Sequence, residues 1–171
     1  MTNRRARELS PTRPYIFLHG VDNTVVTNVP APLTWGLCVI KTSELHYVCN
    51  DDRVVVRRGG AGIYEITVSL CVEKKAANPG HSIIELYVNG VALQCGITHG
   101  YMGGALAQHS NAIMIYTVYL NEGDYIQTYV YLDNGSGQVE SGTGRFRMKG
   151  LSMRGWNNES GGRDRIKGAN R

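Results

Sequence analysis

The chain has 171 residues, of which 42% are apolar and 19% charged, a composition typical of one globular domain and not of a disordered segment. No apolar run approaches the roughly 18 residues that cross a bilayer, which argues against an integral membrane protein. The formal net charge of +4 is unevenly divided, because residues 1–14 carry +3, residues 145–171 carry +6 and the middle carries −5. The charged start has no apolar stretch behind it, so we expect no secretory signal there.

The first third of the chain contains short apolar runs that are typical of β-strands and are separated by turn residues. These runs cover residues 14–19, 23–28, 33–42, 45–49 and 53–57. A glycine-rich turn at residues 59–62 follows, and a long alternating strand over residues 62–73 comes directly after it. Its even-numbered residues from Tyr64 to Val72 are apolar, which predicts a strand with one buried face.

The remainder continues the same pattern without helical periodicity. A strand over residues 82–89 ends at Asn89-Gly90, a strong hairpin signal, and residues 91–97 form the predicted return strand. Further strands are predicted at residues 112–120, 124–132 and 144–153, with the turn 121–123 between the first two. Residues 73–81 and 97–111 are predicted as long loops. About ten strands at this spacing indicate an all-β sandwich or barrel.

The residues that commonly carry chemistry show no catalytic or metal-binding spacing. The four cysteines contain no Cys-x-x-Cys pair, and we expect reduced thiols, with Cys71 and Cys95 buried in strands. The five histidines form no ligand motif, although His99 and His109 share a predicted loop and could meet at a three-fold axis. Asp51-Asp52 and Asp133-Asn134 are interpreted as turn formers rather than as calcium ligands. With no nucleophile elbow or phosphate loop, the sequence predicts a non-enzymatic protein without metal or cofactor.

Three short motifs carry a resemblance to a known family. They are Ala61-Gly62-Ile63-Tyr64-Glu65-Ile66, Leu86-Tyr87-Val88-Asn89-Gly90 and Leu120-Asn121-Glu122-Gly123-Asp124-Tyr125-Ile126. In this order they resemble the complement-q and tumour-necrosis-factor superfamily of jelly rolls, over about residues 15–154. The resemblance implies a ten-stranded jelly-roll β-sandwich that forms a compact homotrimer and serves as a binding or structural head. The absence of a Gly-x-y repeat and of a membrane stalk favours the viral or phage members, which include capsid decorations and head fibres.

Two strands also predict an oligomer on physical grounds. In residues 112–120 and 124–132 both faces are apolar or aromatic, so one face of each strand is left over after the core is filled. Rigid tyrosines are favoured at interfaces. The alternative is that another segment of the same chain, such as residues 14–19, covers them. The residues predicted to lie in the trimer interface are Tyr116, Tyr119, Tyr125, Tyr129 and Tyr131.

These features predict three parts: a basic arm at residues 1–14, a jelly-roll domain at 15–154 and a basic extended tail at 155–171. The expected function is a virion structural protein, a trimeric decoration or fibre-type head on the capsid surface. It would be anchored to the major capsid protein or another virion protein through its basic ends. The residues predicted to make this attachment are Arg4, Arg5, Arg7, Arg13, Arg163, Arg165, Lys167 and Arg171.

Two alternatives stay open from the sequence. One is a jelly-roll capsid subunit whose arginine-rich arm binds nucleic acid, with the salt dependence that phosphate contacts produce. The other is an extracellular ligand-binding module of the complement or cytokine kind, which would recognise its partner through the loops at residues 73–81 and 97–111. None of these three functions is expected to involve a membrane.

Overall fold

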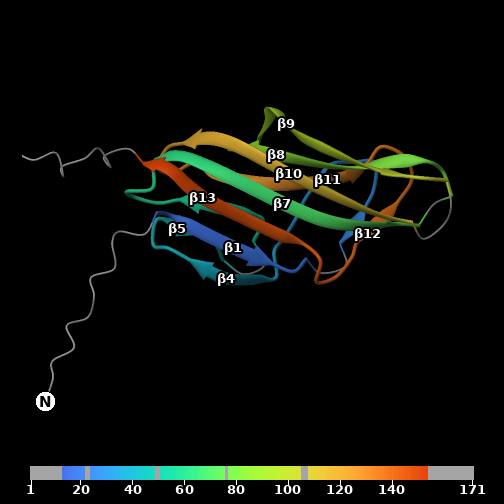
Figure 1. Cartoon of the computed structure of the whole chain (residues 1–171), viewed down its shortest axis with the longest axis horizontal. Coiled ribbons are helices and arrows are strands. Elements are labelled where there is room, and N and C mark those ends of the chain that lie inside the picture. Colours follow the sequence, from blue (N-terminus) through green and yellow to red (C-terminus); the bar gives the residue numbers. More distant parts are fainter. Residues whose placement is uncertain (1–12, 22–23, 49–50, 76, 105–107, 154–171) are drawn as a thin grey trace, which may run out of the picture.

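Two antiparallel sheets lie face to face along the long axis of the body (Figure 1). The structure is a computed structural model that describes residues 13–21, 24–48, 51–75, 77–104 and 108–153. In chain order the strands are β1 (Tyr15–His19), β2 (Val25–Val26), β3 (Ala31–Pro32), β4 (Leu37–Lys41), β5 (Leu45–His46), β6 (Arg53–Val56), β7 (Gly62–Lys74), β8 (Gly80–Val88), β9 (Val91–Met102), β10 (His109–Leu120), β11 (Tyr125–Leu132), β12 (Gly137–Val139) and β13 (Arg145–Met153).

The first sheet, called sheet A, is organised around the long strand β7. Strand β10 pairs with one edge of β7 from Gly62 to Glu73, and β13 and β12 pair with successive parts of the other edge. Strands β1 and β4 continue the sheet beyond β13, and β2 continues it beyond β12. The predicted alternation of β7 is confirmed, because its even-numbered side chains are buried from Tyr64 to Lys74.

The second sheet, called sheet B, has the order β5-β6-β11-β8-β9, with β3 also paired to β11. Asn89 and Gly90 join β8 to β9 with φ values of 53° and 78°, the left-handed geometry that the Asn-Gly signal predicts for a two-residue hairpin turn. The core-facing residues of β11 are Ile126, Thr128, Val130 and Leu132, as expected from its alternation.

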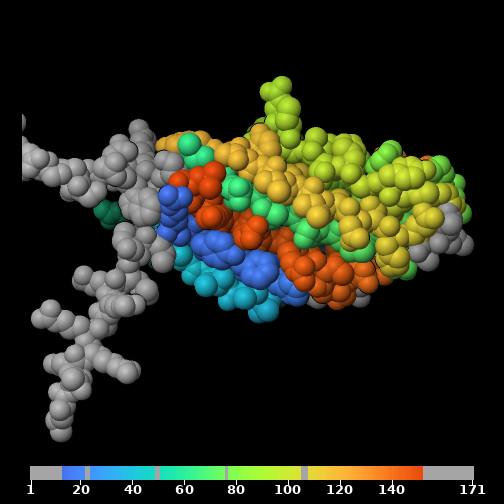
Figure 2. Space-filling view, viewed as in Figure 1, coloured from blue at the N-terminus to red at the C-terminus, as the bar shows by residue number. Residues whose placement is uncertain are grey.

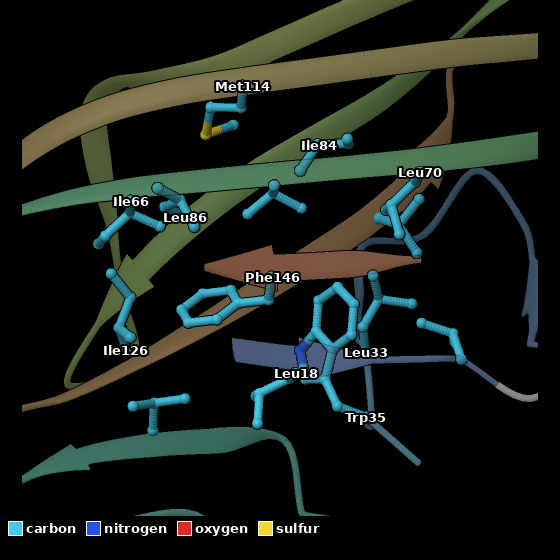
Figure 3. Packing of buried hydrophobic residues seen from close by; sticks show 14 of the residues in the cluster. Leu18, Leu33, Trp35, Ile66, Leu70, Ile84, Leu86, Met114, Ile126 and Phe146 are labelled. Carbon is cyan, nitrogen blue, oxygen red and sulfur yellow. The ribbon is translucent and has the colours of Figure 1, made fainter. Parts of the chain in front are cut away.

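The core fills the space between the two sheets. Trp35, which follows β3, packs its ring against Phe146 of β13 at a centroid separation of 5.8 Å. Leu18 and Ile66 from sheet A face Leu86 and Ile126 from sheet B in the same layer (Figure 3). Both sheets therefore contribute apolar side chains to the core, and the outer face of each sheet takes no part in it.

The described chain begins and ends at the same end of the sandwich (Figure 1). Tyr15 at the start of β1 lies opposite Lys149 near the end of β13, and the Gly150 amide donates a 2.8 Å hydrogen bond to the Pro14 carbonyl. Met153 in turn lies opposite Gly62, at the start of β7. Strands β7 and β9 end at the far end of the sandwich (Figure 1).

Three sequence expectations about the strands are corrected. The described residues contain thirteen strands rather than about ten, and the short strands β3 and β12, of two and three residues, lie outside every predicted run. Much of the predicted loop 97–111 is strand, since β9 extends to Met102 and β10 begins at His109. Gly100 suggested a loop, but it is needed where β9 passes the Ser82 and Ser110 hydroxyls, because a Cβ there would collide with both.

The turn at residues 121–123 connects strands of different sheets. Its flanking strands do not pair with each other, because β10 belongs to sheet A and β11 to sheet B. The turn therefore carries the chain from one layer to the other.

The cysteines follow the prediction only in part. Cys71 and Cys95 are free thiols, but Cys95 is exposed, at a positive φ of 64° next to the hairpin, instead of buried. Within the described residues, no helix is long and apolar enough to cross a membrane.

Candidate functional site: the outer face of sheet A

The outer face of sheet A is built from the odd-numbered residues of four neighbouring strands. Strand register aligns them in rows across β10, β7, β13 and β1. One row contains Ile113, Ser69, Arg145 and His19, and the next contains Ile115, Thr67, Arg147 and Phe17. Figure 2 shows these strands as parallel stripes across one surface of the molecule.

Large apolar side chains stand in solvent along the β10 edge of this face. Ile113 is 62% exposed, Ile115 67% and Tyr119 47%, and Ile63 of β7 lies opposite Tyr119. Three of these four side chains are aliphatic and have no polar atom that could form a hydrogen bond with water. We call this set (Ile63, Ile113, Ile115 and Tyr119) the β10 apolar row. Contiguous exposed apolar residues of this kind mark a contact surface.

A second apolar edge lies on the opposite side of the same face. Leu37 and Ile40 of β4 are both more than half exposed. They pair with His19 and Phe17 of β1, whose side chains share the outer face. We call Leu37 and Ile40 the β4 apolar edge. The face therefore has two different apolar borders, one at each end of its rows.

A basic band separates the two borders. Arg145, Arg147 and Lys149 of β13 are all exposed on this face, and Lys149 lies opposite Glu65 of β7. The two arginines line a shallow hollow of about 330 Å³ with Tyr15 and Phe17. The hollow combines aromatic rings with guanidinium groups, which suits contact with an acidic or aromatic surface.

The predicted interface tyrosines do not share one surface. Tyr119 lies in the β10 apolar row. Tyr116 lies on the opposite side of β10, half-buried against the core, and its hydroxyl donates a 2.9 Å hydrogen bond to the Gln94 carbonyl of β9. The structure therefore separates two residues that the sequence placed together.

The other three predicted tyrosines lie on the outer face of sheet B and are half-buried there. The Tyr129 ring stacks on Tyr87 with centroids 4.0 Å apart, and the Tyr131 hydroxyl donates a 3.0 Å hydrogen bond to Glu85. Partial burial and the neighbouring Glu85 carboxylate raise the pKa of Tyr131 to about 12. Tyr125 lies beneath the Arg53 guanidinium. Contact of these tyrosines with a second copy remains a prediction.

Most of the predicted attachment residues lie outside the described residues. These are Arg4, Arg5, Arg7, Arg163, Arg165, Lys167 and Arg171. Arg13 is described and exposed at the start of the sandwich, where it lines a hollow with Tyr15 and Lys41. The boundaries of the arm and the tail, and their role in attachment, therefore stay predictions.

One cluster was missed by sequence reasoning. Cys71 of β7, His109 of β10 and Glu140 after β12 bring their potential ligand atoms within 4.8 Å of one another. Cys71 and His109 are 38 positions apart in the sequence, and His109 and Glu140 are 31 positions apart. No local spacing could therefore have revealed the cluster. Burial, followed by the hydrogen bond and charge of Glu140, raises the pKa of the Cys71 thiol to about 11.

This cluster is not arranged for nucleophilic catalysis. A thiol with so high a pKa is protonated at neutral pH and is a weak nucleophile. The same His109 nitrogen, Nδ1, lies nearest both the Cys71 sulfur and the Glu140 carboxylate. A catalytic triad instead uses opposite ring nitrogens for the nucleophile and the orienting acid.

The second predicted histidine, His99, lies elsewhere. Its ring is 6.0 Å from that of His81 on sheet B, while His109 is in sheet A, so the two histidines of the expected pair are on different sheets. The His81 Nδ1 is 2.7 Å from Asp133, and Asp51 and Asp52 contact Arg53. These aspartates therefore already have partners.

Comparison with known proteins supports the fold and leaves the role open. No family model matches the chain, and no curated protein matches it. Among solved structures, murine APRIL at pH 5.0 matches with a TM-score of 0.55 and 15% identity. Murine APRIL at pH 8.5 gives a TM-score of 0.53 and 14% identity; both matches cover 79% of this chain and 98% of the other. The chain therefore has a TNF-like jelly-roll fold.

Proposed function

We propose that this chain is the non-enzymatic, homotrimeric head of a larger assembly, of the virion-decoration or head-fibre kind, attached by its basic ends. The observation that carries the proposal is the common exit of the two ends beside Tyr15 and Met153. The basic segments at residues 1–14 and 155–171 are therefore joined to the sandwich at the same end. An assembly of copies would present all of them toward one partner surface.

The outer face of sheet A supports the trimeric part of the proposal. Its β10 apolar row and β4 apolar edge are different surfaces on opposite borders of one face. Two unlike surfaces that pack against each other make a head-to-tail contact, which forms a ring when the rotation between copies closes and an open filament when it does not. Three copies is the number that the superfamily resemblance implies. Full burial of each large apolar side chain contributes about 1.5–3 kcal/mol, so several per subunit would make the ring stable.

The attachment is tested with two truncated chains, one lacking residues 1–13 and one lacking residues 155–171. Each is compared with the full chain for mass in solution and for copies bound per purified virus particle. We expect both truncated chains to stay trimeric while their occupancy on the particle falls at least tenfold. Normal occupancy after both truncations, or absence of the full chain from particles, would contradict the proposal.

The capsid-subunit alternative has one observation in its favour, since both basic segments are joined to the sandwich at the same end. It predicts that the full chain retards single-stranded DNA in a gel and that this binding weakens steeply with salt. The decoration proposal predicts little retardation at physiological salt. The same measurement with the truncated chains shows whether the ends are responsible.

A further inference from the structure

Three side chains from separate segments meet on the outer face of sheet A, at the end of the sandwich away from Tyr15 and Met153. The Cys71 sulfur is 3.9 Å from His109 Nδ1, and His109 Nδ1 is 3.7 Å from Glu140 Oε2. The second distance is longer than an N–H···O hydrogen bond. The three groups are therefore gathered closely but not bonded tightly to one another.

Backbone pairing fixes this arrangement. In the register between β7 and β10, Asn111 lies opposite Cys71, so His109 is two residues away on the same face. In the register between β7 and β12, Val139 lies opposite Val72, and the Glu140 amide then donates a 2.9 Å hydrogen bond to the Cys71 carbonyl. All three ligand-bearing residues are thus anchored to the same stretch of β7, which limits the distances between their side chains.

The spacing and the donor types match a tetrahedral zinc ion. Zinc binds thiolate sulfur at about 2.3 Å and imidazole nitrogen or carboxylate oxygen at about 2.0–2.2 Å. Tetrahedral angles then place the sulfur about 3.6 Å from the nitrogen and the nitrogen about 3.4 Å from the oxygen. The two separations that involve His109, 3.9 and 3.7 Å, are close to these values, and all three ligand atoms lie within 4.8 Å of one another.

The two outer ligands have room to make that adjustment. The His109 side chain is 50% exposed and that of Glu140 is 47% exposed. Cys71 and Glu140 also line a groove of about 640 Å³ together with Asn111 and Arg145. A cation held by the three side chains therefore has access to solvent on the groove side.

We propose that Cys71, His109 and Glu140 bind a Zn²⁺ ion whose fourth position opens into this groove. One sulfur, one nitrogen and one oxygen ligand favour a borderline-soft cation over Mg²⁺ or Ca²⁺, which prefer oxygen ligands alone. Binding of the cation deprotonates the thiol and ties β7, β10 and the segment after β12 together. Ile113 of the β10 apolar row lines the same groove, so the site borders the proposed contact between copies, but all three ligands come from one chain.

The test is a titration of the purified full chain with Co²⁺, which takes tetrahedral zinc sites and gives visible absorption bands and a thiolate-to-cobalt charge-transfer band. The ligand variants are Cys71→Ser, His109→Asn and Glu140→Gln. The matched controls are Cys95→Ser and His99→Asn, which change the same residue types outside the cluster. Circular dichroism checks that each variant is folded.

We expect one Co²⁺ per chain, with tetrahedral bands that Zn²⁺ abolishes by displacement. Cys71→Ser should remove the charge-transfer band, the other two ligand variants should weaken binding at least tenfold, and the controls should behave as the unmodified chain. Zn²⁺ should also raise the melting temperature of the unmodified chain but not that of His109→Asn. The proposal would be overturned if the unmodified chain gave no tetrahedral bands, if the charge-transfer band survived Cys71→Ser, or if Cys95→Ser lost the bands to the same extent. His109 and Glu140 are half-exposed, so their variants keep the test decisive should Cys71→Ser fail to fold.

Discussion

The outer faces of the two sheets are both rich in large side chains, but the tyrosines of β11 on sheet B have partners within the chain, whereas the isoleucines of β10 on sheet A are exposed. On sheet B, Tyr129 stacks on Tyr87, and Tyr131 donates its hydroxyl to Glu85. On sheet A, Ile113 and Ile115 are more than 60% exposed and have no such neighbours to cover them. Tyrosine presents a ring to its neighbours and a hydroxyl to a polar partner, whereas isoleucine has only apolar surface.

This contrast between the two faces indicates which of them needs a partner. Aromatic content alone predicted that the tyrosines of β11 would be hidden by other copies, and their lateral contacts on sheet B supply part of that cover. The exposed aliphatic residues on β10 have a stronger requirement for burial from outside. We therefore place the contact between copies on sheet A.

The largest expected effect comes from placing a charge in the β10 apolar row. Ile115→Lys would bury an unpaired ammonium group in the interface, so we expect the trimer dissociation constant to rise about a hundredfold or more. Light scattering at micromolar concentration should show the monomer, with the far-ultraviolet circular dichroism unchanged. Val91→Lys changes an equally exposed aliphatic residue on β9 and should leave the trimer intact. A trimeric Ile115→Lys would place the contact elsewhere.

A smaller effect is expected from breaking the tyrosine stack on sheet B. Tyr129→Ala removes the contact with Tyr87 and half-buried ring surface, which should lower the free energy of unfolding by about 2–3 kcal/mol. The mass in solution should not change, because the tyrosines of β11 on this face have partners within the chain. Urea denaturation at one fixed protein concentration measures the loss, with Tyr101→Ala, which removes a mostly exposed ring, as the control. Conversion to a monomer would mean that sheet B carries the interface.

The turn that carries the chain from sheet A to sheet B should depend on a charged aspartate. Burial works to raise the pKa of Asp124, but hydrogen bonds from Asn89 and Asn121 outweigh it and hold the pKa below its usual value. Since the folded pKa is the lower one, the stabilisation is present at neutral pH and is lost as pH falls through that lowered pKa, below about pH 4.

Asp124→Asn should cost about 1 kcal/mol at pH 7 and flatten the stability profile below pH 4. Urea midpoints measured between pH 2.5 and 7 test this. Glu122→Gln, an exposed neighbour in the same turn, is the control. An unchanged acid profile in Asp124→Asn would show that its hydrogen bonds contribute no stability.

The smallest expected effect comes from removing the Tyr131 hydroxyl on the outer face of sheet B. Partial burial and Glu85 raise the pKa of Tyr131 to about 12, so its contribution is complete below about pH 10 and is lost as pH rises toward 12. Tyr131→Phe should cost about 0.5 kcal/mol at neutral pH and make stability less sensitive to pH in that alkaline range. Absorbance of the phenolate during alkaline titration gives an independent check. An identical alkaline profile would contradict the assignment.

Sequence reasoning predicted the elements that depend on local pattern. The alternation of β7, the Asn-Gly hairpin and the closing strand β13 follow from spacing and turn chemistry alone. The all-β sandwich follows from these elements, and its TNF-like fold agrees with the resemblance carried by the three short motifs.

What could not be predicted depends on contacts between distant residues. The route of the chain at residues 121–123, from sheet A to sheet B, is set by which strands each flank pairs with, and the turn itself is compatible with either outcome. The approach of His109 and Glu140 to Cys71 needs the registers of β10 and β12 against β7. Gly100 was interpreted as a loop residue because its packing against two serines is invisible in the sequence.

The central claim is that sheet A joins copies of this chain around a three-fold axis. Sedimentation equilibrium of the unmodified full chain at micromolar concentration tests it directly. The account predicts a single species with three times the 18.8 kDa mass of one chain. A species with the mass of one chain across that concentration range would contradict it.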